Sequence, residues 1–116
     1  MTKINIYTVL NSAYWKFGKI FIDSLYDKVD LDRINKIYIS DTGLDQDQIE
    51  YLKSKSEIEI IDSNISTNFE GGTWSEEWHQ VVTSKTKVLK DIISKDGHPT
   101  VMIDADCLFL DDITDL

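Results

Sequence analysis

Strand and helix patterns alternate along the whole chain, and this alternation limits the folds that it can adopt. Runs of residues typical of β-strands lie at residues 4–10, 34–39, 58–61 and 100–103. Apolar residues at helical spacing lie between these runs, at residues 14–26, 49–52 and 78–93. The order predicts an α/β, Rossmann-like fold, in which helices flank a mostly parallel sheet and the crossover connections are right-handed.

Polar residues at the ends of these patterns indicate where helices and turns begin. Ser12 follows the first strand and is a candidate N-cap for the first helix, and Asp41 is expected to be a turn residue. Two segments match the capping box; they are Asp45 with Gln48 and Thr73 with Glu76. Gly97 and Pro99 are typical of a helix end. The polar stretch 64–72 predicts a mobile loop.

The size of the chain predicts a single α/β domain that comprises residues 1–116. No apolar run approaches the ~20 residues of a membrane span, and the N-terminus lacks the pattern of a secretory signal. Cys107 is the single cysteine, which excludes an internal disulfide and favours a reducing compartment, most simply the cytoplasm. Because it has no companion of the kind that zinc sites need, we expect it to be a small buried side chain.

The charge of the chain is strongly acidic. Its net charge of −9 argues against nucleic-acid binding, which relies on lysine and arginine at the phosphates. Acidic residues gather towards the C-terminal end of the sequence. For Asp111, Asp112 and Asp115 a solvated acidic surface is the favoured interpretation. Asp104 and Asp106 differ from these because they directly follow a strand pattern.

The carboxylates of Asp104 and Asp106 are the strongest candidates for function. Asp104 and Asp106 lie two positions apart, and we expect a bend after Ile103 that aims both carboxylates at one point. With that bend, two oxygen ligands meet at the carboxyl end of a buried strand, where open α/β sheets tend to bind ligands. Oxygen ligands suit hard divalent cations. The sequence therefore predicts a site for Mg²⁺ or Mn²⁺ here.

Lys85 lies on the apolar face of its predicted helix, where a charged residue is unusual. At ~100° per residue, Lys85 falls near the centre of the apolar face of the third helix, whereas Lys87 points the opposite way. A buried, unpaired ammonium is costly. Lys85 therefore either extends to the protein edge or pairs with a structural carboxylate, or serves as a functional cation near the acidic pair. Both interpretations stay open, and the short turn after this helix allows Lys85 to approach Asp104.

Four segments in order resemble a known enzyme class. A basic helix at residues 83–93 precedes residues 101–113, where a strand ends in Asp-x-Asp and leads into a hydrophobic and acidic stretch. Together they resemble the nucleotide-diphospho-sugar glycosyltransferases of the GT-A fold, most nearly the family 8-like enzymes. Residues 7–14 are similar to the first strand and loop of that family, and residues 37–44 to its second strand and turn.

The resemblance implies a role for each matching residue. Asp104 and Asp106 would hold Mn²⁺ or Mg²⁺ against the diphosphate of a nucleotide-sugar donor, most simply a UDP-sugar, and Asp104 would also approach the ribose. Val9 and Asn11 would lie against the nucleoside. Lys85 would take the place of the basic residue near the donor sugar.

The resemblance also implies that this chain is the nucleotide-binding, N-terminal half of such an enzyme. Chains of the family continue well beyond the Asp-x-Asp motif, whereas this one ends at Leu116. The acceptor pocket, a later metal ligand and a catalytic base would then lie outside it. An uncovered sheet edge and apolar face would favour self-association.

Two other functions are compatible with the same residues. In a phosphatase of the haloacid dehalogenase type, a strand also ends in Asp-x-Asp and its first aspartate is a nucleophile, here Asp104. That motif normally opens its chain and carries Thr or Val where Leu108 stands. A non-catalytic interaction or scaffold module of the same fold, with an inert acidic tip, is the other alternative.

Overall fold

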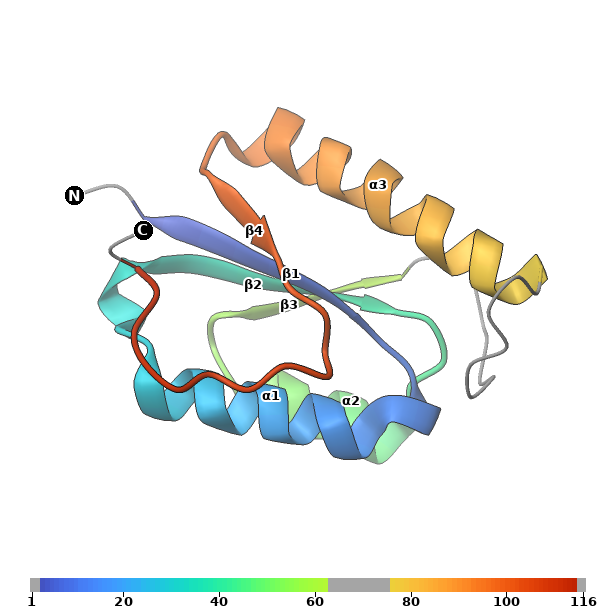
Figure 1. Cartoon of the computed structure of the whole chain (residues 1–116), viewed down its shortest axis with the longest axis horizontal. Coiled ribbons are helices and arrows are strands. Elements are labelled where there is room, and N and C mark those ends of the chain that lie inside the picture. Colours follow the sequence, from blue (N-terminus) through green and yellow to red (C-terminus); the bar gives the residue numbers. More distant parts are fainter. Residues whose placement is uncertain (1–2, 63–75, 115–116) are drawn as a thin grey trace.

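The computed structural model describes residues 3–62 and 76–114. In these ranges the chain forms one β-sheet with helices packed on its two faces (Figure 1). The four-stranded sheet has the order β3-β2-β1-β4, and every neighbouring pair is parallel. Its strands are β1 (Ile4–Leu10), β2 (Ile34–Asp41), β3 (Ile58–Asp62) and β4 (Thr100–Met102). The predicted fold class is confirmed.

The helices cover both faces of the sheet. They are α1 (Trp15–Lys28), α2 (Gln46–Lys53) and α3 (Glu76–Asp96), with short 3₁₀ turns at Ser12–Tyr14 and Leu31–Arg33. Helices α1 and α2 lie on one face and α3 on the opposite face (Figure 1). Along the chain, β2 and then β3 are added on one side of β1. Helix α3 then connects β3 to β4, which pairs with the other side of β1. This reversal between β1 and β4 is a topological switch point.

The main core lies between the sheet and α1. Ile6 and Leu10 of β1 pack with Phe21, Ile22 and Leu25 of α1, and all five are almost completely buried. Apolar residues at helical spacing on α1 and at alternate positions on β1 produce this layer, as their periodicities require.

The segment after β4 returns along α1 (Figure 1) and completes this core. Phe109 is buried, and its ring centroid lies 5.2 Å from that of Phe21. The backbone N–H of Phe109 donates to Ser24 Oγ over 3.0 Å, and Ala105 is also part of the core cluster. Phe109, which follows Asp-x-Asp, thus has a structural role.

Several local expectations are confirmed. In the capping box of α2, Gln48 Oε1 accepts from the backbone N–H of Asp45 over 2.9 Å. Asp41 forms the expected turn, since its Oδ1 accepts from the N–H groups of Gly43 and Leu44. Gly97 has the positive φ of 80° that ends α3. The capping residue Thr73 and the predicted loop at 64–72 lie outside the described residues.

Other expectations were wrong. The first N-cap is Asn11, whose Oδ1 accepts from the N–H of Tyr14 over 3.0 Å, whereas the hydroxyl of Ser12 donates to Asp45. Cys107 is exposed because the tight turn that it closes lies at the surface.

The acidic C-terminal stretch is also less uniform than predicted. Asp111 is exposed, as expected of a solvated carboxylate. The carboxylate of Asp112 instead accepts from Thr114 and from the N–H of Asp30. The hydrogen bond from the Thr114 backbone is the main reason that the pKa of Asp112 is lowered. Asp115 lies outside the described residues.

Candidate functional site

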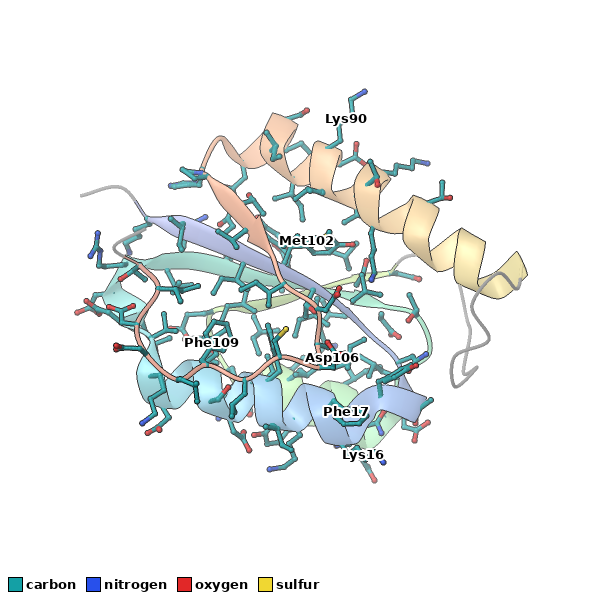
Figure 2. The ribbon with its side chains drawn as sticks, in the orientation of Figure 1. Lys16, Phe17, Lys90, Met102, Asp106 and Phe109 are labelled. Carbon is teal, nitrogen blue, oxygen red and sulfur yellow. The ribbon has the colours of Figure 1, made fainter. Side chains whose placement is uncertain are left out.

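The bend required after β4 is present in the form of a tight turn. Strand β4 ends at Met102, and the N–H of Ile103 still donates to Tyr7 O of β1 over 3.0 Å. The N–H of Cys107 then donates to Asp104 O over 3.2 Å, which makes Asp104 the first and Asp106 the third residue of a β-turn. Both side chains are exposed. The turn therefore presents two carboxylates at the carboxyl end of β4, and Figure 2 shows Asp106 at this turn.

The neighbouring carboxyl end of β1 carries the other two predicted contacts. Val9 is half-buried and pairs in register with Ser40 of β2. Asn11 is only 6% exposed and caps the 3₁₀ turn that leads into α1. Asn11 thus has a structural role that sequence reasoning assigned to Ser12. The parallel pairing of β1 with β4 places these residues and the acidic turn at the same end of the sheet.

Helix α3 directs Lys85 towards the acidic turn. Ile92, two turns later on the same stripe of the helix, is buried, whereas Lys87 and Lys90 are exposed; Figure 2 shows Lys90 pointing away from the sheet. Lys85 Nζ lies 3.4 Å from Asp104 Oδ1, and the Lys85 side chain is 27% exposed. Of the two interpretations of Lys85, the structure supports pairing with a carboxylate. That carboxylate is Asp104, a member of the acidic pair, so Lys85 also lies where a functional cation was predicted.

The two carboxylates of the turn suit a metal ion that is bound by the protein and by a ligand at the same time. Among the side chains of residues 3–62 and 83–114, no group of three or more from His, Cys, Asp or Glu is placed to hold a metal ion. Mg²⁺ is usually bound through one or two carboxylates together with water and substrate phosphates, so two carboxylates on one turn fit it. The ammonium of Lys85 against Asp104 already shows that this position accepts a positive charge.

A second polar cluster at the opposite end of the sheet holds α3 and β4 in place. The carboxylate of Asp96, the last residue of α3, accepts from Tyr38 Oη over 2.6 Å and from Asn35 Nδ2 over 3.2 Å. The backbone N–H of His98 donates to it over 3.3 Å, and its ring contacts it. Asn5 joins the cluster through Asn35. These bonds tie the α3–β4 connection to β1 and β2, and so help to set where Lys85 and Asp104 lie.

We expect this cluster to make a pH-dependent contribution to stability. The hydrogen bond from Tyr38 is the main reason that the pKa of Asp96 lies below its ordinary 3.8. A carboxylate with a lowered folded-state pKa contributes stability that is complete above the unfolded pKa and is lost as pH falls towards the folded one. We expect the advantage of the wild-type chain over Asp96→Asn to shrink by roughly 1 kcal/mol between pH 6 and pH 3.

Urea unfolding of both variants at the two pH values measures this effect. Asp91→Asn is the matched control, because Asp91 is an exposed carboxylate on the same helix. An Asp96→Asn difference that does not change with pH would contradict the assignment.

An apolar patch lies beside the acidic turn. Leu110 is 79% and Leu108 56% exposed, and with Ile103 and Ile113 they line a groove of about 370 Å³. Within the described ranges, β4 pairs with β1 alone, so its other edge is open. Large exposed apolar side chains beside an open edge are typical of interaction surfaces.

No family model and no curated protein sequence matches this chain. The glycosyltransferase resemblance therefore stays a prediction from the residues given above. No helix in the described ranges has both the length and the apolar character needed to cross a membrane.

Proposed function

We propose that this chain is the donor-binding part of a metal-dependent glycosyltransferase and binds a nucleoside-diphosphate sugar, most simply a UDP-sugar. One observation carries the proposal. The acidic turn at Asp104 and Asp106, with Lys85 against it, lies at the carboxyl end of β4 next to β1, where the sheet reverses its winding. Open α/β sheets bind their ligands at such switch points.

Each residue has a separate task in this proposal. Asp104 and Asp106 would hold Mn²⁺ or Mg²⁺, which when bound offsets the negative charge that develops on a leaving diphosphate. Lys85 gives the phosphates a second positive contact. Val9 offers an apolar contact to the nucleoside, and Asn11 holds the backbone of the loop before α1. Donor binding alone is proposed for these residues, and no catalytic base is assigned.

Calorimetric titration of UDP in the presence and absence of Mn²⁺ tests the proposal. We expect binding that requires the metal and that Asp106→Asn removes. Absence of heat with either ligand would instead favour a non-catalytic interaction module, which the exposed patch at Leu108 and Leu110 makes the second candidate. Metal-dependent trapping of beryllium fluoride at Asp104 without a nucleotide would favour a phosphatase.

The single cysteine continues to favour a reducing compartment, most simply the cytoplasm.

We also propose that the apolar patch at Leu108 and Leu110 mediates weak self-association. The net charge of −9 opposes the approach of two copies, so association should rise with protein concentration and with salt, which screens the repulsion. Sedimentation velocity at several concentrations in low and high salt measures this. Leu108→Asp/Leu110→Asp should stay monomeric, whereas Ile20→Asp, at a side chain 54% exposed on α1, should behave as wild type. Wild-type chain that is monomeric throughout would contradict the proposal.

A further inference from the structure

The ion pair between Lys85 and Asp104 joins two different elements of the fold. Lys85 lies on α3 and Asp104 follows β4, 19 positions later in the sequence. Their 3.4 Å contact therefore depends on how α3 packs on the sheet and does not arise from local helix geometry. Lys85 lies on the stripe of α3 that includes the buried Ile92 two turns away, and its ammonium points towards the acidic turn.

The two carboxylates of the turn differ in their electrostatic surroundings. Asp104 faces the Lys85 ammonium. Asp106 has no ion-pair partner in the part of the chain that the structure describes. The thiol of the neighbouring Cys107 lies 4.0 Å from its Oδ1 and makes only a weak contact. Asp104 remains 66% exposed, so an incoming cation can reach its second oxygen and can then displace the ammonium from the first.

We infer that Lys85 is an internal counter-ion of Asp104, which occupies the cation position until a divalent ion binds and then moves to the phosphates of the ligand. This inference rests on the proposed donor site. The physical reason is competition between charges of the same sign. An ammonium 3.4 Å from a carboxylate oxygen is stabilised by that oxygen, but it is repelled by a divalent cation bound to the same group. The diphosphate of a nucleotide offers Lys85 a new anionic partner.

The inference predicts effects of opposite sign from one substitution. Lys85→Met keeps the length and the apolar stem of the side chain but removes its charge. Binding of Mn²⁺ alone should become tighter, by about two- to fivefold, because partly exposed ion pairs contribute little. Binding of UDP in the presence of saturating Mn²⁺ should become weaker, by about tenfold, because a charge-assisted contact to phosphate is lost.

Lys87→Met is the matched control. Lys87 is exposed on the same helix and carries the same charge, so it tests whether a change in net charge alone alters Mn²⁺ affinity. Mn²⁺ binding is measured by electron paramagnetic resonance of the free ion in buffers of low and high salt. The gain from Lys85→Met should decrease at high salt, which screens the pair in the wild-type chain.

A second measurement follows the lysine directly. Nitrogen-detected NMR of lysine ammonium groups in a ¹⁵N-labelled chain resolves Lys85 from Lys87 by comparison with the two variants. Titration with diamagnetic Mg²⁺ should shift the Lys85 ammonium signal with the same midpoint as metal binding, while the Lys87 signal stays in place. Addition of UDP should then shift the Lys85 signal again.

Failure of this inference is distinguishable from failure of the proposed function. If the wild-type chain binds UDP with Mn²⁺, and Asp104→Asn removes that binding, the donor site stands. In that case the counter-ion role is overturned if Lys85→Met binds Mn²⁺ no better than Lys87→Met does, or if the Lys85 signal ignores Mg²⁺. If the wild-type chain binds neither Mn²⁺ nor UDP, the donor site and the counter-ion role are both rejected.

Discussion

Asp106→Asn should lower the affinity of the chain for UDP in the presence of Mn²⁺ by about 100-fold or more, because even residues that merely orient a metal ligand typically contribute 10–100-fold in affinity. Asp106 is the better of the two carboxylates for this test. It has no ion-pair partner among the described residues, whereas Asp104 contacts Lys85, and a change there would disturb two interactions at once.

The fold should be unaffected by this substitution, since Asp106 is exposed and an exposed polar substitution usually changes the free energy of unfolding by less than about 0.5 kcal/mol. Asp111→Asn is the matched control, because Asp111 is an exposed carboxylate five positions later in the same segment. Calorimetry on the three chains, with circular dichroism to verify folding, measures the effect. If Asp106→Asn and Asp111→Asn bind UDP and Mn²⁺ equally well, the metal site is not at this turn.

Phe109→Ala should lower the free energy of unfolding by about 3–5 kcal/mol, the usual cost of removing a buried phenylalanine ring. Phe109 is 6% exposed and packs on Phe21, so its loss leaves a cavity between the C-terminal segment and α1. A loss of this size is a large part of the stability of a small domain. The prediction extends to the candidate site, because the same segment holds the Asp104–Cys107 turn against the core through Ala105.

Urea unfolding with equal m-values in both chains measures this loss. Leu110→Ala is the control, because Leu110 is the residue next to Phe109 in the same segment and is 79% exposed. We expect that control to stay within about 0.5 kcal/mol of wild type. Equal stabilities for Phe109→Ala and Leu110→Ala would mean that the segment does not pack on α1.

The positions of helices and strands could be read from the sequence because their causes are local. Alternating or helical spacing of apolar residues predicted β1 at its observed limits and the other elements within a few residues of theirs. The turn at Asp41 and the capping box at Asp45 depend on neighbours two or three positions away, and such short-range bonds leave a clear signal in the sequence.

The errors lie where a side chain has a choice of distant partners. The hydroxyl of Ser12 donates a hydrogen bond to Asp45, a residue 33 positions away. The N-cap of the 3₁₀ turn before α1 is therefore Asn11 and not Ser12. Asp96 directly precedes the predicted helix end at Gly97, and its carboxylate accepts hydrogen bonds from β2 and from the turn after α3. Its position before Gly97 and close to His98 was the one available signal, and that signal does not identify Tyr38 as the main partner.

For the candidate site, residue chemistry and residue placement have different origins. The sequence alone determined that two carboxylates follow a strand, that a lysine shares the apolar stripe of a helix and that strands alternate with helices, since each depends on spacing along one element. The tertiary structure decided that β4 pairs with β1 and not with β3, and that Lys85 meets Asp104. Pairing across the chain depends on which apolar surfaces bury each other, a property of the whole packed domain that no local pattern encodes.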